Sequence, residues 1–487
     1  MIKICLVAAF PPSMGPLNEY SFHLAREIQR HKDVELTILA DELEDYTFAT
    51  DAEGNPVDPQ QSSKLPGVNV IRCWKFGSLS TPVRLLNTIR QLKPDVVWFN
   101  LVFSTFGSPE SPFAAFAGLS VPVLTRAAGF YTHITLHHII EHVDFASAGV
   151  RRREKLLRKG TDAATWTLLK AHSVSVLLSD YRRTLRAKYS AQNILVGTHG
   201  TFAAIPRPPD LTKRGNPDVR ILAFGNWGTY KRLERLMEAF PSVLERIPNA
   251  RLIVAGGNHP AATGYWESIR EGQPAGLPIE FLGYIPQKDV PNLFRTSSLL
   301  VMPYDSSTGS SGPAHQACEY GVPIVCADIA DFRCMATDDD MAIVFYKPGD
   351  AADLADKLLT VLESPELLRQ MSEHNYEAGV QMTMATVARN YLRWFELHKA
   401  KRTIAGKGTL ARIRRRWLGS WSSHQDKSAV GWEPAGKFLP KSATSAGKME
   451  IPSSGSAKSQ SQRNLPPGIE HTERDWYNAD PDLEQAE

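Results

Sequence analysis

The sequence predicts an α/β protein with two doubly wound domains, each built on a parallel sheet, and a long polar tail. Short apolar runs typical of buried strands alternate with amphipathic segments in two series, the pattern of parallel sheets covered by helices. A Pro-rich segment separates the two series, and after residue 402 Ser, Gly, Lys and Pro dominate, a composition typical of disorder. We therefore expect an N-terminal domain at 1–205, a linker at 206–217, a C-terminal domain at 218–380, a C-terminal helix at 381–402 and a largely disordered tail at 403–487.

Thirteen apolar runs are the candidate strands of the two domains. The first series lies at 2–8, 34–40, 68–74, 94–100, 121–127, 173–179 and 193–199, and the second at 219–225, 251–257, 279–285, 298–304, 322–328 and 341–347. Ligands of open parallel sheets bind at the carboxyl ends of the strands. Two such domains joined by a linker are thus expected to share a central cleft, which suits a reaction of two substrates.

Composition limits the class of protein and its surroundings. A net charge of +3 over 487 residues gives no bulk basicity, so we expect no nucleic-acid partner. Five widely spaced cysteines without a C-x-x-C pair favour a reduced, cytoplasmic setting. The N-terminal apolar run is broken by Pro11 and Pro12 and is read as a first strand rather than a signal. No apolar stretch approaches the roughly 18 to 20 residues of a membrane span, so only peripheral membrane contact is expected.

A short loop in the second series has the composition of a phosphate cradle. The apolar run 299–302 ends at Pro303, and Pro313 suits the first turn of a helix. The small residues between them have backbone N–H groups that can converge on an anion. They are Thr308, Gly309, Ser310, Ser311 and Gly312. The alternative is an ordinary strand-loop-helix connection with a Ser/Gly hinge.

A series of motifs in the second domain resembles glycosyltransferase family 4, whose members are retaining enzymes of GT-B architecture. The motifs are GNWGTYKRLERLMEAF at 225–240, RLIVAGG at 251–257, FLGYIP at 281–286 and EYGVPIV at 319–325. The resemblance implies that Lys231 holds the donor diphosphate beside Asn226, which stands where the family usually has arginine. It also places Gly225, Gly256, Gly283 and Tyr284 around the donor nucleotide.

The chain departs from the family pattern at charged positions. The two glutamates of the family, eight positions apart, fall on Thr308 and Gln316, which keep hydrogen bonding and lose charge. In the first domain Gly15 resembles the start of the family's Gly-Gly loop, although Pro16 replaces the second glycine. A histidine common in the family is absent after residue 97, where Trp98 and Asn100 stand, so Asn100 and His133 are the expected acceptor-side residues.

Four histidines between 133 and 142 have the spacing of helical i,i+4 pairs. They are His133, His137, His138 and His142. Such pairs can hold zinc, and the alternatives are a polar helix face or, for His133, a loop residue that reaches the acceptor. GT-B enzymes generally dispense with a catalytic metal, so the resemblance implies neither a metal nor a cofactor here.

One amphipathic segment stands out in the polar tail. Residues 409–421, TLARIRRRWLGSW, place apolar side chains on one helical face and four arginines largely elsewhere. Such a segment can lie on an anionic membrane surface, at the inner face of the membrane if the protein is cytoplasmic. The alternatives are a solvated basic linker and a helix docked on the acidic end of the tail.

The resemblance implies a retaining glycosyltransferase that moves a sugar from a nucleotide-diphospho-sugar to a hydroxyl of a saccharide or a lipid-linked acceptor, in polysaccharide or glycoconjugate synthesis. Lys231 would stabilise the leaving diphosphate, without a covalent protein nucleophile. One alternative is a catalytically degenerate sugar-nucleotide binder or partner subunit, because Asn226, Thr308 and Gln316 remove charges from the site. The other is an isomerase resembling nucleotide-sugar 2-epimerases, which needs carboxylates in the cleft.

Overall fold

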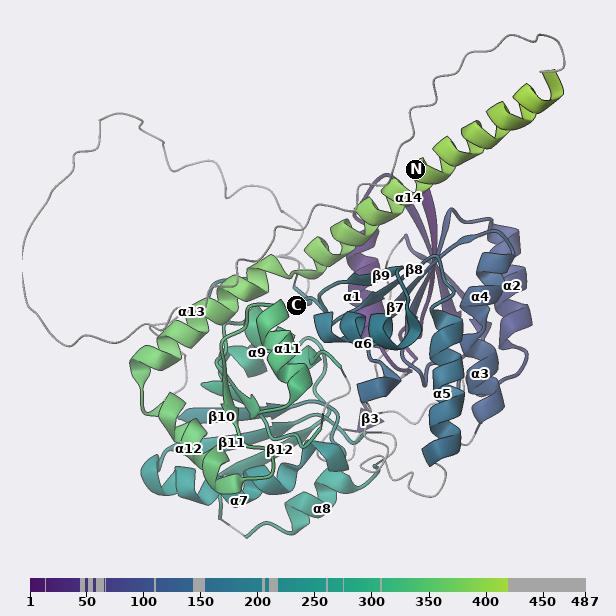
Figure 1. Cartoon of the computed structure of the whole chain (residues 1–487). Helices are drawn as coiled ribbons and strands as arrows, with labels where there is room; N and C mark the ends of the chain where they lie inside the picture. The colour runs from purple at the N-terminus through teal and green to yellow at the C-terminus, as the bar shows by residue number, and fades with distance from the viewer. Residues whose placement is uncertain are drawn as a thin grey trace, which may run out of the picture. The chain divides into compact units, whose positions relative to one another are not determined.

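The structure is a computed structural model, which describes residues 1–13, 15–43, 49–50, 56–57, 65, 67–108, 111–142, 154–203, 206–209, 218–259, 262–274, 276–306 and 309–418 (Figure 1). Two α/β domains with parallel sheets make up this part of the chain, as the sequence predicts. A separate antiparallel pair joins β3 (Ala49–Thr50) to β4 (Pro56–Val57).

The N-terminal domain is built on a sheet of seven parallel strands in the order β5-β2-β1-β6-β7-β8-β9. Its strands are β1 (Ile2–Val7), β2 (Val34–Asp41), β5 (Asn69–Trp74), β6 (Val96–Leu101), β7 (Tyr131–Leu136), β8 (Ser173–Val176) and β9 (Ile194–Val196). Its helices are α1 (Asn18–Ile28), α2 (Thr81–Leu92), α3 (Pro112–Leu119), α4 (Val121–Ala127), α5 (Glu154–Leu168) and α6 (Ser179–Tyr189). A 3-10 turn, η2, covers Ile140–His142.

One predicted strand of this domain is wrong. Residues 121–127 form helix α4, and the strand follows as β7 at Tyr131–Leu136. Pro122 fits the first turn of a helix, where its missing N–H costs nothing. Gly129 then adopts a positive φ of 92°, and every residue of β7 is buried. The histidines of this region therefore do not share one helix, so the spacing behind the zinc interpretation is also wrong.

The C-terminal domain confirms all six strands predicted for it, in the order β12-β11-β10-β13-β14-β15. The strands are β10 (Val219–Phe224), β11 (Ala250–Ala255), β12 (Ile279–Gly283), β13 (Leu299–Met302), β14 (Ile324–Ala327) and β15 (Ile343–Tyr346). The helices are α7 (Leu233–Arg246), α8 (Tyr265–Glu271), α9 (Val290–Arg295), α10 (Gly312–Glu319), α11 (Ala330–Asp338), α12 (Ala351–Leu362) and α13 (Pro365–Gln381), with a 3-10 turn, η3, at Thr229–Lys231. Strands β13 and β14 are buried at every residue, as expected where helices cover both faces of a sheet.

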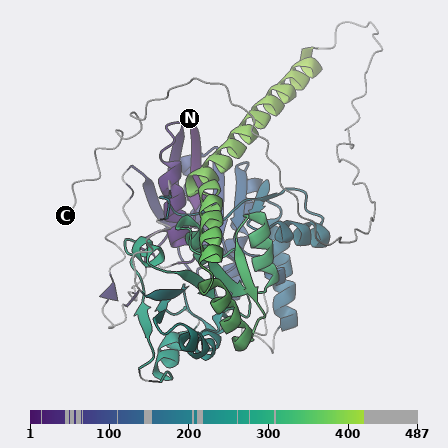
Figure 2. The same cartoon turned by 90° about the vertical axis from the view of Figure 1, so that its left-hand side faces the viewer.

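The first part of the last helix, α14 (Met384–Leu418), belongs to the core of the N-terminal domain, through buried residues between Met384 and Phe395 (Figure 2). The ring of Tyr391 lies 4.6 Å from that of Trp98, and the ring of Phe395 lies 5.2 Å from Trp98. The helix runs 16 residues past the expected boundary at 402, and the largely disordered tail expected from 403 onward stays a prediction. Residues 419–487, including the end of the predicted amphipathic segment, lie outside the described residues.

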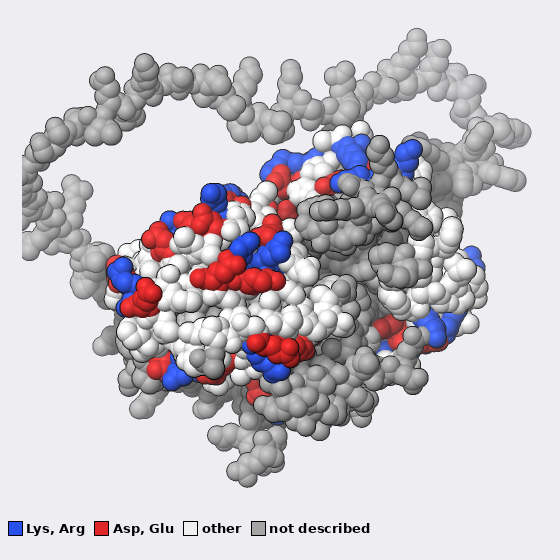
Figure 3. Space-filling model, turned by 90° about the horizontal axis from the view of Figure 1, so that it is seen from below, with Lys and Arg blue, Asp and Glu red and all other residues white. Residues whose placement is uncertain are grey.

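The described surface carries both signs of charge. In Figure 3, lysines and arginines alternate with aspartates and glutamates and with broad uncharged areas. The five cysteines are buried and unpaired. Among the residues that the structure describes, no helix combines the length and the apolar character that a membrane span requires.

Candidate functional site

Three of the predicted donor residues meet at the carboxyl ends of neighbouring strands. Gly225 and Gly256 follow β10 and β11, and Gly283 ends β12. The N–H of Gly256 donates to the carbonyl oxygen of Gly283 at 2.6 Å. A Cβ atom on Gly256 would lie 2.1 Å from the carbonyl oxygen of Gly225, and the φ of Gly256 is 107°. Only glycine allows this backbone approach at the strand ends.

Lys231 lies in turn η3, directly beside these glycines. A Cβ atom on Gly225 would lie 3.0 Å from Lys231 Nζ, 3.6 Å from Pro313 Cγ and 3.7 Å from the Tyr304 hydroxyl. The amine faces three aromatic rings, with centroids at 5.1 Å for Tyr304 and 5.8 Å for both Trp227 and Tyr230. Within the described part of the chain no carboxylate forms an ion pair with it. Burial lowers the pKa of Lys231 to about 8.

The N-terminus of α10 lies next to this amine, because Pro313 is in its first turn. Ser310 Oγ and the Tyr304 hydroxyl are buried, and neither has a hydrogen-bond partner among the described atoms. Buried polar groups without hydrogen-bond partners are rare in native proteins, so each one needs an explanation. A cation, the Tyr304 hydroxyl beside it and the N-terminus of a helix that the Ser310 loop precedes make this a candidate site for a phosphate or a similar anion. Thr308, predicted as part of this site, lies outside the described residues.

Two predicted cradle residues have structural contacts of their own. Ser311 caps α10, its Oγ accepting from the N–H of Ala314 at 3.4 Å, while its own N–H faces the sulfur of Met335 at 3.4 Å. Gly309 has a φ of 126°, and a Cβ atom on it would lie 2.5 Å from the carbonyl oxygen of His137 in the other domain. Loop 309–312 is thus wedged between α10 and the end of β7.

The remaining predicted donor residues lie around this loop. Gln316 is buried on α10, and Asn226 is exposed beside Gly225. Tyr284 is half-buried, and burial together with the negative charge of Glu19 raises its pKa to about 12. Gly15 lies in the first domain, where its N–H donates to Ser13 Oγ at 3.0 Å.

Glu319 has a different role from the carboxylates of the family pattern. Its Oε2 accepts from the N–H groups of Phe202 at 2.7 Å and Ala203 at 2.9 Å. It thus ties α10 to the segment that leaves the first domain, and it does not replace the carboxylate missing at Gln316.

Asn100 lies at the end of β6 in a chain of hydrogen bonds in which the donor and the acceptor of each bond can be assigned. Ser21 Oγ donates to the carbonyl oxygen of Leu17 at 2.8 Å, so it must accept from Asn100 Nδ2 at 3.0 Å. The Oδ1 of Asn100 then accepts from His137 Nε2 at 2.7 Å. This arrangement fixes the tautomer of His137 and leaves a lone pair on Nδ1. Burial and the neighbouring His199 hold the pKa of His137 well below its ordinary value, so the ring is neutral.

His133 is not the loop residue that the sequence suggested. It lies on β7, is fully buried under α14 and packs against Trp98. Its Nδ1 contacts Ser173 Oγ at 2.7 Å and its Nε2 contacts Ser175 Oγ at 3.1 Å. Both ring nitrogens are thus engaged inside the domain, and neither is left for an acceptor.

The sequence reasoning missed a group of aromatic residues where the two domains meet. Tyr20 lies 4.5 Å from His137 and 5.0 Å from His199, measured between ring centroids. His199 in turn lies 4.8 Å from His315 on α10. His137 had a usable signal in the sequence. It directly follows residues 131–136, which contain β-branched side chains and form β7. His199 and His315 had none, since their proximity depends on how the two domains pack.

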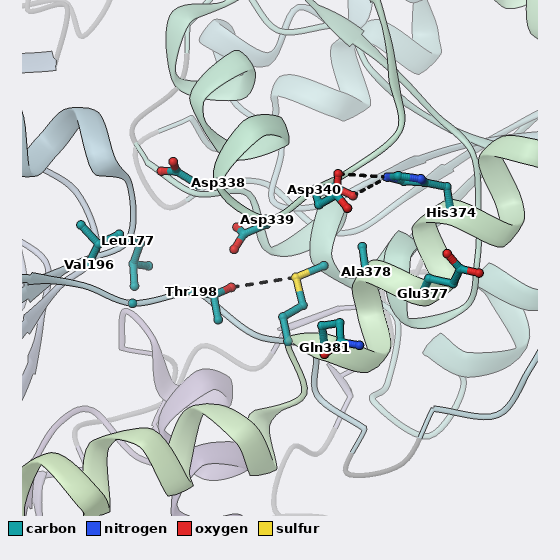
Figure 4. Close-up of a pocket in the computed structure, with 12 residues that line it drawn as sticks. Leu177, Val196, Thr198, Asp338, Asp339, Asp340, His374, Glu377, Ala378 and Gln381 are labelled. Atoms are coloured by element: carbon teal, nitrogen blue, oxygen red, sulfur yellow. Dashed lines mark hydrogen bonds and ion pairs between the residues drawn. The ribbon is translucent and has the colours of Figure 1, made fainter. Parts of the chain in front are cut away.

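A cavity of about 510 Å³ lies on another side of this junction (Figure 4). Thr198 and Asp339 line it from the two domains, and none of the predicted donor residues does. In the part of the chain that the structure describes, no three histidines, cysteines or carboxylates are arranged to hold a metal ion.

Comparisons with known proteins agree with this geometry. Residues 218–364 match the family described as "Glycosyl transferases group 1". A phosphatidyl-myo-inositol mannosyltransferase of Mycobacterium tuberculosis is 26% identical over 219 residues, which cover 44% of this chain and 54% of that protein. The corresponding protein of Mycobacterium leprae is 25% identical over 185 residues, covering 38% and 46%. The match thus spans about half the length of these relatives.

Solved structures share the fold over most of the chain. Sucrose-phosphate synthase of Thermosynechococcus elongatus superimposes with a TM-score of 0.62 at 15% identity, over 82% of this chain and all of that one. HepE of Anabaena, solved in complex with UDP-glucose, has a TM-score of 0.57 at 14% identity, over 81% of this chain and all of that one. These identities establish the fold alone, and that fold is GT-B, as the resemblance implied.

Proposed function

We propose that this chain, whose residues 218–364 belong to the glycosyl transferases group 1, transfers a sugar from a nucleotide-diphospho-sugar to an acceptor hydroxyl. The observation that carries the proposal is Lys231, a buried amine at the N-terminus of α10 for which the described residues supply no carboxylate partner. A diphosphate would neutralise that amine and accept from the Tyr304 hydroxyl beside it, while the Ser310 hydroxyl lies in the loop that leads into α10. The reaction needs no cofactor beyond the nucleotide sugar.

The site would act mainly on the leaving group. As the bond from the sugar to the diphosphate breaks, negative charge grows on the phosphate oxygens. Lys231, the Ser310 and Tyr304 hydroxyls and the amides of the loop would stabilise that charge more strongly than the ground state. The acceptor hydroxyl would attack from the face that the diphosphate leaves, retaining the anomeric configuration, and no covalent protein nucleophile is required.

His137 is the first-domain residue that we expect to contact a substrate hydroxyl. Its fixed tautomer presents the Nδ1 lone pair, which accepts a hydrogen bond. Asn100 serves as the residue that orients it, instead of contacting the acceptor itself. In this proposal His137, four positions later in the sequence, takes the acceptor-side role that was expected of His133.

A nucleotide screen tests the proposal. The purified full chain is examined by thermal shift with UDP, GDP, ADP, dTDP and their common sugar conjugates, because a ligand that binds the folded state raises the melting temperature. Any stabilising conjugate is then assayed for sugar release and for transfer to candidate saccharides. Stabilisation with slow release identifies the donor, and no stabilisation by any of them contradicts the donor site.

A sugar-nucleotide binder without turnover is the second candidate, favoured by Gln316, which stands where the family has a carboxylate and has no charge. Glu319, the nearest carboxylate on α10, is already bonded to Phe202 and Ala203. Stabilisation by a conjugate without release, even when acceptors are added, would favour this candidate over the transferase.

A lipid-linked acceptor at an anionic membrane surface is our proposal for the second substrate. The relatives at 26% identity are named for transfer to phosphatidyl-myo-inositol, and α14 carries Arg412, Arg414, Arg415 and Arg416 near its end. Flotation with vesicles of phosphatidylglycerol and phosphatidylcholine should show binding by the full chain and weaker binding when the four arginines are changed to glutamine. Equal flotation of both proteins would contradict a role of this segment.

A further inference from the structure

His315 lies buried in the first turns of α10 between two hydrogen-bond acceptors. Its Nδ1 is 2.7 Å from the carbonyl oxygen of Ser311, and its Nε2 is 3.2 Å from Asp339 Oδ2. Carbonyl and carboxylate oxygens accept hydrogen bonds and cannot donate them, whereas a neutral imidazole has a single N–H. With Asp339 ionised, only the imidazolium, with an N–H on each nitrogen, satisfies both contacts.

The surroundings of His315 stabilise the positive charge of its ring, and the neighbouring histidine and cysteine are neutral. His315 is fully buried, and the side chain of Asp339 is only 7% exposed, so each charge needs the other. The other titratable groups that face the ring are His199 and, one turn along α10, Cys318. Burial and then the charge of His315 lower the pKa of His199 to about 3, and burial raises the pKa of Cys318. Both therefore stay neutral.

The contact to Ser311 links this charge to the candidate phosphate site. Ser311 caps α10 and ends the loop that carries Ser310, whose hydroxyl has no partner among the described atoms. A hydrogen bond from the imidazolium to the Ser311 carbonyl holds that loop against the helix. It also places a positive charge within the first turns of α10, where the helix dipole already favours an anion.

We propose that His315, protonated between the Ser311 carbonyl oxygen and the Asp339 carboxylate, is a positioning residue that fixes loop 309–312 and strengthens diphosphate binding there. The inference rests on the proposed donor site. It adds a cation to a site in which Asn226 stands where the family has arginine and from which Gln316 removes a carboxylate. His315 acts through the loop and the field of the helix, and it touches no reacting atom.

Asp339 also lines the cavity of about 510 Å³ (Figure 4). The same cavity offers a matched control, because His374 Nε2 lies 3.3 Å from Asp340 Oδ1 on its rim. That second pair is far more exposed, at 44% and 89% of the two side chains. It has the same chemistry without a contact to loop 309–312.

The experiment measures binding of inorganic pyrophosphate to the full chain by calorimetry at pH 7, without divalent cations. The variants are His315→Gln, Asp339→Asn and, as control, His374→Gln. We expect the first two to weaken binding about tenfold and the control to match the wild type. The ¹⁵N shifts of histidine-labelled wild type at the same pH should show a proton on both ring nitrogens of His315, which a merely structural role does not require.

The outcomes distinguish a failure of the role proposed for His315 from a failure of the donor site as a whole. Equal affinity of folded His315→Gln and wild type, or a neutral ring at His315 in the ¹⁵N spectrum, overturns the proposal and leaves the donor site intact. No binding of pyrophosphate by the wild type overturns the donor site, and this inference with it. If His315→Gln fails to fold, the ¹⁵N shifts of histidine-labelled wild type at pH 7 decide, since a neutral ring at His315 contradicts the proposal.

Discussion

Lys231 shows at the scale of one residue why the structure calls for an anionic ligand. Its amine is buried, faces the ring of Tyr304 at 5.1 Å and has a pKa lowered to about 8. Aromatic faces stabilise a cation by about 1–2 kcal/mol, which is less than a desolvated anion provides. The amine is therefore better accommodated when a diphosphate is bound than when the site is empty.

The lowered pKa of Lys231 predicts how nucleotide binding depends on pH. Below pH 8 the amine is already charged, and a diphosphate binds without proton uptake. Above pH 8 the free protein holds a neutral amine, and a bound diphosphate raises its pKa, so binding takes up a proton. The affinity for the nucleoside diphosphate identified by the screen should then fall as pH rises above about 8, by up to tenfold per unit, as calorimetry from pH 7 to 9.5 measures.

Two alanine variants check that this dependence comes from Lys231. Lys231→Ala should bind about tenfold more weakly at pH 7 and lose the fall above pH 8, because the titrating group is gone. Lys347→Ala removes a lysine whose side chain is 77% exposed, and it should behave as the wild type does. A Lys231→Ala protein that retained the wild-type profile would place the titrating group elsewhere.

Asn100 is predicted to act through the tautomer of His137. Asn100→Ala removes the acceptor that keeps the proton on Nε2, so the proton is free to move to Nδ1 and block the lone pair there. We expect turnover to fall about tenfold or more, with the affinity for nucleoside diphosphate unchanged. Steady-state kinetics together with calorimetry separate these two effects.

His133→Gln is the control for this prediction, because His133 is also buried and also hydrogen-bonded at both nitrogens. Its partners Ser173 and Ser175 lie under α14, away from loop 309–312. The variant should unfold at a lower temperature and, while folded, retain full turnover. Loss of turnover in both variants with unchanged stability would instead return His133 to the acceptor side.

The sequence predicts the second-domain part of the candidate site because its signals are local. Gly225 and Lys231 lie six residues apart in one motif, and the Ser/Gly loop precedes its helix directly. His199 and His315 are 116 residues apart and meet only because the segment after β9 packs on α10. No periodicity or spacing encodes that contact, and the resemblance gave no reason to look for it.

At the scale of elements, the strands of the second domain were predictable and one strand of the first was not. Residues 121–127 have the apolar and β-branched composition of a buried strand, yet Pro122 starts helix α4 there. Residues 131–136 contain a histidine and three threonine or tyrosine hydroxyls, which read as polar. They form a central strand because each polar group finds a partner inside the fold, as Tyr131 does with Ser173 at 2.8 Å.

At the strand ends of the second domain, we predict that alanine substitution of two neighbouring glycines lowers the free energy of unfolding by very different amounts. Gly256→Ala would place a Cβ atom 2.1 Å from the Gly225 carbonyl oxygen at a φ of 107°, so both contact and conformation are unfavourable. Gly257→Ala meets no atom within 4 Å. Urea denaturation should show a loss of about 3 kcal/mol or more for the first and less than about 1 kcal/mol for the second. Similar losses for both would contradict the packing of β10 against β11.

At the scale of the whole molecule, the contacts that join the described parts of the two domains besides the linker include three that centre on particular elements or residues. Helix α14 returns from the second domain into the core of the first, and Glu319 bonds the backbone of residues 202 and 203. The third connection centres on Asp331 of α11. Its Oδ2 accepts from the Tyr181 hydroxyl at 2.6 Å, and its Oδ1 lies 2.8 Å from His142 Nδ1. None of these contacts follows from either half of the sequence considered alone.

The contact between Asp331 and His142 makes the stability of the joined domains depend on pH. The hydrogen bond to Asp331 is the main cause that raises the pKa of His142 above its ordinary value of 6.5. Because the folded state raises this pKa, the stabilisation is fully present below pH 6.5 and is lost as pH rises through the raised value. The charged pair therefore stabilises the closed junction most in mildly acidic solution.

Asp331→Asn tests this contact, since it keeps an acceptor for Tyr181 and removes the charge that faces His142. Urea denaturation at pH 6 should show a loss of about 2 kcal/mol, which shrinks as pH rises through the raised pKa of His142. Asp328→Asn is the control, because its ion pair with Arg333 lies at the surface and should contribute under about 1 kcal/mol at every pH. A loss for Asp331→Asn that does not change along a pH series would show that protonation of His142 does not stabilise the junction.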